Sequence, residues 1–196
     1  MTAEMQKPSR KPPAAETPKP QPAAAPPNHI QSFRRALGTF ATGVAIVTTV
    51  SPSGEPTGLT VSSFNSVSLD PPLVLWSLSR RSGNLSIYHE ASHFAVNVLA
   101  ADQITLSSRF STPGPDRFAD LATETGIGGV PLLPDVAACF QCRTEFRYEG
   151  GDHMIFVGQV EAFSHSDRTP LVFCRGAYAA PTPLDLSRPA DRRRDA

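Results

Sequence analysis

The chain has 196 residues, 40% of them hydrophobic and 18% charged, which suits one domain with a core of ordinary size. Lys plus Arg equals Asp plus Glu at 18 each, so the formal net charge is zero and no overall basic field favours nucleic acid as a partner. No window reaches the roughly 18 consecutive apolar residues of a membrane helix, and no signal-peptide core follows Met1, so we expect a cytoplasmic protein without membrane association.

The first 28 residues are dominated by Pro and Ala and have no apolar periodicity. Such a segment cannot bury enough surface to offset the entropy of ordering, so residues 1–28 are predicted to form a disordered, partly polyproline-like tail. We expect the folded domain over residues 29–182, and a flexible C-terminal tail over residues 183–196.

A short amphipathic helix is predicted from His29. Apolar side chains recur there at steps of three and four residues: Ile30, Phe33, Leu37 and Phe40. The β-branched run over residues 44–50 predicts a strand, and residues 51–55 are typical of a turn that reverses the chain.

Residues 60–68 alternate small hydroxyl side chains with β-branched and aromatic ones, which predicts one strand. The Asp70-Pro71-Pro72 segment ends it in a turn, because proline removes backbone donors. The apolar run 73–78 predicts a second strand that can be buried on both faces. A hydroxyl-rich strand can donate hydrogen bonds to a planar ligand and its phosphate, or its serines can simply face solvent.

The loop 79–84 carries Arg80 and Arg81 among hydroxyl residues, and Ser82 or Asn84 is placed to cap a helix over residues 85–88. Cations beside a helix N-terminus make a suitable phosphate site. An ordinary loop between a strand and a helix has the same composition, so both interpretations stay open.

The rest of the chain consists of short predicted elements separated by Gly and Pro. We expect strands over 93–99, 137–148, 153–163 and 171–173, a helix from Asp102 to 107, and loops over 112–118 and 126–135. Within 137–148 the side chains of Phe140, Cys142, Thr144 and Phe146 are predicted to share one face. Many short strands with few helices predict a mostly β fold, a β-barrel with peripheral helices.

The three cysteines are an odd number, which suits a reducing compartment. Cys139 and Cys142 have the CxxC spacing of a redox dithiol or of half a zinc site. No second ligand pair accompanies them, and they fall within a predicted strand, so packing as small hydrophobes is favoured and no metal is expected.

The turn Gly151-Asp152-His153 places two titratable side chains on a backbone that can approach a ligand closely. His153 could contact a nicotinamide or a phosphate, and its near-neutral pKa would make that contact sensitive to pH. The alternative is that Asp152 only caps the turn and His153 only ends a strand.

Taken together, these segments resemble the flavin reductase-like family. Its pattern G-x-T-x-x-S-F-x-S-V-S-x-x-P-P-L-V is matched by Gly58, Thr60, Ser63, Phe64, Ser66, Val67, Ser68, Pro71, Pro72, Leu73 and Val74. The resemblance extends from about Phe33 to about Tyr178 and includes FRRALGTFATGVAIVTT, SIYHEASHFAVNVL, EGGDHMIFVGQVE and RGAY. It implies an FMN-binding split β-barrel, ordinarily a homodimer with its flavin sites near the subunit interface.

The activity that the resemblance implies is hydride transfer from NADH or NADPH to FMN or FAD. No GxGxxG motif indicates a separate nucleotide domain, so the nicotinamide is expected to bind over the flavin. The reduced flavin would then diffuse to a partner monooxygenase. Two alternatives remain: a flavin-binding carrier or sensor without turnover, and a split-barrel reductase of another acceptor such as a corrinoid or a ferric complex.

The resemblance also implies the site. His153 is the expected catalytic residue, and Asp152 joins it in the substrate pocket. The expected cofactor-binding residues are Thr60, Val61, Ser62, Ser63, Ser66, Val67, Ser77, Leu78, Ser79, Arg81, Ser82, Asn84, Arg109 and Phe110, with Thr42 and Gly43 as secondary candidates. Ser62 and Cys174 depart from residues common in the family and could alter the preference for flavin or pyridine nucleotide.

Overall fold

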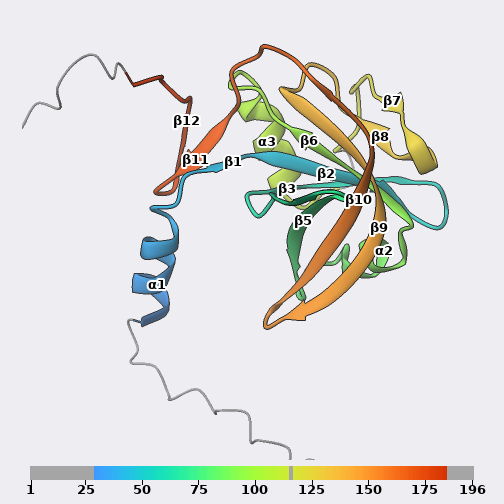
Figure 1. Ribbon diagram of the computed structural model, residues 1–196, viewed down its shortest axis with the longest axis horizontal. Coiled ribbons are helices and arrows are strands. Elements are labelled where there is room, and N and C mark those ends of the chain that lie inside the picture. The colour runs from blue at the N-terminus through green and yellow to red at the C-terminus, as the bar shows by residue number, and fades with distance from the viewer. Residues whose placement is uncertain (1–28, 115–116, 185–196) are drawn as a thin grey trace, which may run out of the picture.

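The computed structural model describes residues 29–114 and 117–184 (Figure 1). The predicted tail 1–28 and nearly all of 183–196 lie outside the described residues. The elements are α1 (His29–Leu37), β1 (Thr42–Gly43), β2 (Ala45–Val50), β3 (Pro56–Val61), β4 (Asn65–Leu69), β5 (Pro72–Ser79), α2 (Leu85–Glu90), β6 (His93–Val98), α3 (Ile104–Ser111), β7 (Glu124–Thr125), η1 (Ile127–Gly129), β8 (Pro131–Leu132), β9 (Ala138–Gly150), β10 (His153–His165), β11 (Val172–Cys174) and β12 (Ala177–Ala179).

The main sheet has seven antiparallel strands in the order β3-β2-β6-β9-β10-β5-β4. Its two edge strands, β3 and β4, are consecutive in the sequence and are joined by residues 62–64. The chain therefore passes directly from one edge of the curled sheet to the other, and the mostly β barrel expected from the sequence is confirmed. No helix among the described residues is long and apolar enough to cross a membrane.

This connection makes the prediction of one strand over residues 60–68 wrong. Thr60 and Val61 pair with β2, whereas Asn65 and Ser66 pair with β5. The residue pattern is that of a strand on both sides of the break, because both halves are strands. Only the closure of the barrel requires the chain to leave one partner for another at residues 62–64.

Aromatic packing fills the barrel around Trp76. Its ring stacks on Phe156 with centroids 4.7 Å apart and meets Tyr88 edge-on at 5.0 Å. The Tyr88 hydroxyl donates to the Val47 carbonyl at 2.7 Å, so α2 is tied into the core by its one fully buried side chain. A second cluster, of Val44, Ile46, Leu99, Phe110, Leu133 and Leu171, lies under α3.

Strand β5 alternates instead of being buried on both faces as predicted. Val74, Trp76 and Leu78 are buried, whereas Leu73 and Leu75 are only half-buried. The reason is that the second face of this strand points away from the barrel interior.

The predicted alternation of residues 137–148 also fails at its end. Thr144 pairs with Gly158 and Phe146 with Val157, so Glu145 is an extra residue without a partner on β10. This β-bulge moves the following side chains to the other face. Phe146 is consequently 45% exposed, whereas Cys142 remains in the core.

The helices lie where predicted, with different ends. Asn84 precedes α2 but its side chain makes no capping hydrogen bond, contrary to the expectation for it or Ser82. Helix α3 begins at Ile104 and not at Asp102, and the Asp102 carboxylate is paired with Arg168. Strand β12 was not predicted; with β1 and β11 it forms a small sheet that leads away from the barrel to α1 (Figure 1).

Candidate flavin and nicotinamide site

A cavity of about 490 Å³ opens where three segments of the chain meet: β3, the loop between β5 and α2, and the end of α3 with the loop that follows it. It is lined by Leu59, Thr60, Arg81, Ser82, Gly83, Asn84, Phe110, Ser111, Pro113, Gly114 and Arg117. Five of these residues were predicted from the sequence: Thr60, Arg81, Ser82, Asn84 and Phe110. A cavity of similar volume between β8 and the far end of β10 contains none of the predicted residues.

Hydroxyl groups hold the loop 79–84 in a tight conformation. The Ser79 hydroxyl accepts the backbone N–H of Arg81 at 3.3 Å, and the Ser82 hydroxyl accepts that of Asn84 at 3.3 Å. Short polar side chains that bond nearby backbone donors are typical of such turns. The loop is thereby fixed with Arg81 exposed at the cavity.

Gly58, next to the cavity residue Leu59, packs closely against Phe110, which lines the cavity. A Cβ on Gly58 would lie 2.7 Å from the Phe110 ring, so only glycine fits there. Thr60 also belongs to this wall, but its hydroxyl donates to the Ser107 carbonyl at 2.8 Å. Its hydroxyl therefore holds α3 on β3, and its backbone remains the group through which it could meet a ligand.

Arg117 is a cavity residue that the sequence reasoning missed. Its guanidinium donates to the carbonyl oxygens of Gly58 at 2.7 Å and of Thr112 at 2.9 Å, which fixes a positive charge in the wall. Arg109, the predicted second phosphate-side arginine, donates instead to the Ala119 carbonyl and does not line the cavity. The only signal for Arg117 was its position in a loop rich in Gly and Pro.

Ser63 joins the two edges of the barrel. Its hydroxyl donates to the Ser77 carbonyl and accepts the Ser77 N–H, both at 3.0 Å, so the side chain takes the place of a backbone partner beyond the end of β4. Ser62 is exposed on the same crossing, and Ser66 and Val67 are exposed on β4, which follows it.

The side chains of Val61 and Leu78 point into the core, at 7% and 5% exposure. Of these two predicted cofactor-binding residues, only the backbone can therefore reach a ligand. Ser77 and Ser79 are half-buried on the opposite face of β5 from Leu78. Thr42 and Gly43 form β1 beside β11, outside the residues that line the cavity.

The β9–β10 hairpin brings Asp152 and His153 to the same end of the barrel as the loop 79–84. Gly151, with φ of +70°, forms the turn, and the Arg80 N–H donates to the Asp152 carbonyl at 2.9 Å. His153 is the Cα partner of Ser79. The predicted nicotinamide residues and the predicted phosphate loop are therefore hydrogen-bonded neighbours.

Asp152 and His153 form a polar pair at this hairpin tip. The Asp152 carboxylate lies 2.8 Å from His153 Nδ1, at 90% and 44% side-chain exposure. This hydrogen bond and the charge of His153 lower the pKa of Asp152, and the nearby Arg81 lowers it further. Asp152 is thus anionic at neutral pH and fixes the orientation of the imidazole.

The chemistry of the cavity matches an anionic, partly aromatic ligand. Two guanidinium groups, from Arg81 and Arg117, lie in its wall together with the Ser82 hydroxyl and the Asn84 amide, and Phe110 is apolar. Guanidinium and hydroxyl donors are the groups that bind phosphate. The residues present therefore fit a flavin phosphate with part of its ribityl chain.

The thiols of Cys139 and Cys142 are buried, and burial raises their pKa values to about 11 and about 12. Both are then neutral at physiological pH, which disfavours metal binding and redox exchange. Among the described residues, no group of three or more His, Cys, Asp or Glu is arranged to hold a metal ion.

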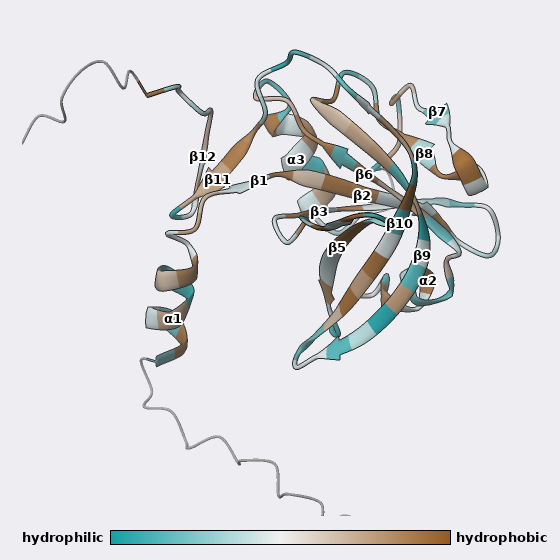
Figure 2. Cartoon of the chain, in the orientation of Figure 1, coloured by the Kyte–Doolittle hydropathy of each residue, from teal (hydrophilic) through white to brown (hydrophobic). Residues whose placement is uncertain are grey.

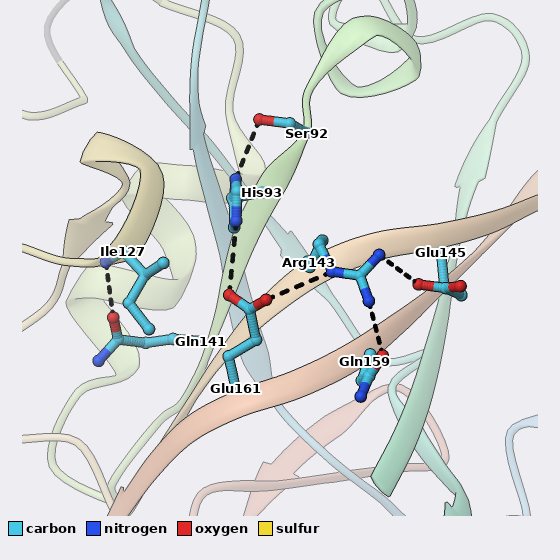
Figure 3. A network of polar contacts seen from close by, with 8 residues as sticks. All are labelled: Ser92, His93, Ile127, Gln141, Arg143, Glu145, Gln159 and Glu161. Atoms are coloured by element: carbon cyan, nitrogen blue, oxygen red, sulfur yellow. Dashed lines mark hydrogen bonds and ion pairs between the residues drawn. The ribbon is translucent and has the colours of Figure 1, made fainter. Parts of the chain in front are cut away.

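A second polar cluster, which the sequence did not indicate, ties β6, β9 and β10 together (Figure 3). Glu161 lies 3.4 Å from His93 Nε2 and 3.3 Å from Arg143 Nε. Arg143 also reaches Glu145 at 2.7 Å and the Gln159 amide oxygen at 2.7 Å. None of these residues lines the cavity, so we interpret the cluster as a structural link.

Comparison with known proteins gives consistent results. Residues 37–182 match the model of the flavin reductase like domain. An FMN reductase (NADH), SmoA, from Agrobacterium fabrum is 50% identical over 148 residues, which cover 76% of this chain and 84% of that protein. The reductase component of a flavin-dependent trigonelline monooxygenase from Acinetobacter baylyi is 44% identical over 154 residues. That alignment covers 79% of this chain but only 50% of the relative, so the chain spans about half of its length.

A solved structure supports the same assignment of fold. The NADH:FAD oxidoreductase SgcE6 of Streptomyces globisporus superposes with a TM-score of 0.75 at 36% identity, over 84% of this chain and 100% of that one. The same oxidoreductase has also been solved in complex with NAD and FAD fragments.

Proposed function

The chain belongs to the flavin reductase like family, and on that basis we propose that it is an NAD(P)H-dependent flavin reductase, which transfers hydride to FMN or FAD. The observation that carries this proposal is the cavity in which Thr60, Arg81, Ser82, Asn84 and Phe110 meet although they come from three separate segments. Two of the relatives described above are named for NADH, so NADH is the first donor to test.

We assign the flavin phosphate to the side of the cavity formed by Arg81, Ser82 and Asn84, with Arg117 opposite. The flavin ring would then extend toward the β3–β4 crossing and the start of β4, where Ser62 and Ser66 are exposed. Bound flavin supplies the ring that accepts hydride from the nicotinamide. The contribution of the chain is to hold the two reactants in position, since this transfer needs no general base.

His153 is the proposed orienting residue for the nicotinamide. Because its Nδ1 is engaged by Asp152, its Nε2 is the atom available to the carboxamide of the donor. A neutral imidazole accepts there from the carboxamide N–H, and a protonated one donates to the carboxamide oxygen. Either contact places the nicotinamide beside the loop that carries Arg81.

The partner and the cellular location expected from the sequence extend this proposal. A flavin-dependent monooxygenase would take up the reduced flavin by diffusion, as expected of the reductase components among the relatives. We further propose that the protein is a homodimer and acts in the cytoplasm, where reduced pyridine nucleotide is supplied and free thiols stay reduced.

An anaerobic titration tests the activity. Addition of NADH to the protein with FMN or FAD is expected to bleach the flavin absorbance. With air admitted and free flavin in excess, NADH oxidation should then continue for many turnovers per subunit. Binding without bleaching would identify a carrier or sensor, and bleaching of one bound flavin without turnover would identify a reductase of another acceptor.

A further inference from the structure

Ser107 is a fully buried polar residue to which the proposed function assigns no role. It lies on α3, and its carbonyl accepts the hydroxyl of Thr60 at 2.8 Å and that of Ser111 at 2.7 Å. Thr60 and Ser111 both line the cavity. A single buried residue therefore joins two parts of the cavity wall, one on β3 and one at the end of α3.

The hydroxyl of Ser107 bonds a distant residue and not its own helix. Ser111, at the end of α3, and Thr112, just after it, each donate to the carbonyl four residues earlier. The Ser107 oxygen instead lies 2.9 Å from the hydroxyl oxygen of Tyr178, 71 residues away in the sequence. Serine in a helix readily bonds its own backbone, and a buried hydroxyl without a partner is costly. The Tyr178 hydroxyl therefore keeps Ser107 in this orientation.

Tyr178 reaches α3 from the small sheet. It lies on β12, and its ring meets that of its Cα partner Phe173 on β11 at 65°, with centroids 5.6 Å apart. Phe173 in turn packs against the cluster under α3 that contains Phe110. Figure 2 shows β11 as a hydrophobic strand. Apolar packing thus holds the small sheet against the barrel, and the Tyr178 hydroxyl adds a directional bond to α3.

We propose that Tyr178 is a positioning residue for the flavin. It fixes Ser107 through the hydrogen bond between their hydroxyls, and Ser107 joins Thr60 to the end of α3. Tyr178 is not among the residues that line the cavity, so it acts through α3 and not by contact with the ligand. This inference rests on the proposed function, because it concerns the same cavity. It adds a residue of the small sheet to a site otherwise built from β3, the loop 79–84 and α3.

Loss of this hydrogen bond is expected to affect flavin binding more than hydride transfer. A wall that is held less firmly must lose more conformational freedom when the ligand binds, which lowers affinity. The hairpin that carries His153 is fastened to the loop 79–84 through the Arg80 N–H, a contact in which Tyr178 takes no part. The position of the nicotinamide should therefore be retained once flavin is bound.

A fluorescence titration of the full chain with FMN tests the proposal. Tyr178→Phe removes the hydroxyl and keeps the ring that packs on Phe173. It is expected to raise the Kd for FMN by about three- to tenfold, the range for one net hydrogen bond. Steady-state kinetics with varied FMN should show the same rise in KM with an essentially unchanged kcat. A variant with the Kd and KM of the wild type overturns the proposal.

Ser107→Ala tests the other partner of the bond. It is expected to weaken FMN binding by a similar factor. The double variant Tyr178→Phe/Ser107→Ala should bind no more weakly than the weaker of the two single variants, because both remove the same contact. Losses that multiply in the double variant would show that the two residues act separately, and they would overturn the proposal.

Ser166→Ala is the matched control for Ser107→Ala. It removes a hydroxyl contact of the same kind, from the loop after β10 to the Val136 carbonyl at 3.0 Å, beside the second cavity. Its Kd for FMN is expected to equal that of the wild type. Equal losses in Ser166→Ala and Ser107→Ala would mean that binding follows overall stability, which contradicts a positioning role.

Hydrogen–deuterium exchange on the protein without flavin tests the contact independently of the reductase assignment. Tyr178→Phe is expected to speed amide exchange in α3 and to leave exchange in the β9–β10 hairpin unchanged. Unchanged exchange in α3 overturns the proposed contact. If exchange changes as expected but the wild-type protein binds no flavin, the proposed function fails instead, and the role of Tyr178 in flavin binding fails with it.

Discussion

At the scale of single residues, several of the polar side chains predicted to bind flavin also hold backbone groups of the segments around the cavity. The hydroxyls of Ser63, Ser79 and Ser82 each bond backbone groups of the β5 strand or of its following loop. His153 differs, because among the described residues its side chain bonds only the adjacent Asp152 carboxylate. Substitution of His153 should therefore affect chemistry more than folding.

His153→Ala is expected to raise the KM for NADH by about tenfold, which corresponds to one lost hydrogen bond of roughly 1.4 kcal/mol. Flavin affinity should change much less, because the phosphate side of the cavity is intact. Steady-state kinetics with varied NADH, paired with a flavin fluorescence titration, measures both. His165→Ala, at the exposed far end of β10, is the control.

Loss of flavin binding in the same variant would make His153 a flavin ligand, and unchanged constants would make the turn purely structural.

The pH dependence of the Asp152–His153 pair has a defined sign on the Asp152 side. Since the pKa of Asp152 is lowered from its usual 3.8, its carboxylate stays charged through neutral pH. Its contribution to the pair is present above the ordinary carboxyl pKa and is lost only as the pH falls through the lowered value.

Tyr88→Phe is expected to lower the free energy of unfolding by about 1–3 kcal/mol, because it removes the buried hydroxyl that donates to the Val47 carbonyl. Burial also raises the pKa of Tyr88, so the group is a neutral donor at all accessible pH values. Chemical denaturation measures the change. Tyr148→Phe, at a 53% exposed position, should leave the midpoint in place; equal effects of the two substitutions would contradict the argument.

At the scale of elements, the cavity depends on how three segments are fastened to each other. The Arg80 N–H joins the loop 79–84 to the β9–β10 hairpin, and Thr60 joins β3 to α3. Arg80 and Arg81 are adjacent, but only Arg81 lines the cavity, while Arg80 lies 3.6 Å from Glu149. The loop therefore contains a cavity arginine and a matched arginine outside the cavity.

Arg81→Ala is expected to weaken flavin binding by about ten- to a hundredfold, as for a charge-assisted hydrogen bond worth roughly 1.5–3 kcal/mol. Arg80→Ala should change it little, because its ion pair is exposed. Fluorescence titration with FMN and with riboflavin measures the difference. Riboflavin lacks the phosphate, so its affinity should not change on Arg81→Ala. Equal losses from the two variants would exclude a specific phosphate contact.

Substitutions of Ser63 test whether the crossing between the barrel edges contributes to stability and to flavin binding. Ser63→Ala removes both hydrogen bonds to Ser77 and is expected to lower stability by about 1–3 kcal/mol while it leaves space for the ligand. Ser63→Leu should in addition weaken flavin binding strongly, since a bulky side chain blocks approach to the backbone. Flavin affinity that is unchanged in the leucine variant would remove Ser63 from the site.

At the scale of the whole molecule, the barrel carries its candidate chemistry at one end, and α1 extends from the small sheet of β1, β11 and β12 (Figure 1). The buried residues of the three core clusters all lie between Val44 and Leu171. The composition of those residues indicates no core of their own. Stability and turnover should accordingly belong to the part of the chain that begins at α1.

Deletion of residues 1–28 is therefore expected to leave the melting temperature and the rate of NADH oxidation essentially unchanged. Calorimetry and steady-state kinetics on the truncated and full chains make the comparison. A fall of several degrees on truncation would mean that the segment docks on the folded domain.

The sequence by itself determined the features that depend on neighbouring residues. The period of Ile30, Phe33 and Leu37 predicted α1, and the Gly151-Asp152 turn predicted the hairpin that carries His153. The family pattern around Ser63 predicted the mostly β barrel and the flavin chemistry. These signals are local, because helix periodicity, turn conformation and motif spacing involve groups only a few residues apart.

Only the tertiary structure decided what depends on pairing between distant segments. Closure of the barrel divides residues 60–68 between two edges, and the bulge at Glu145 places Phe146 outside the core. Folding of the loop after α3 places Arg117, and not Arg109, in the cavity wall. Strand pairing and side-chain packing are set by partners dozens of residues away, so no local pattern could have specified them.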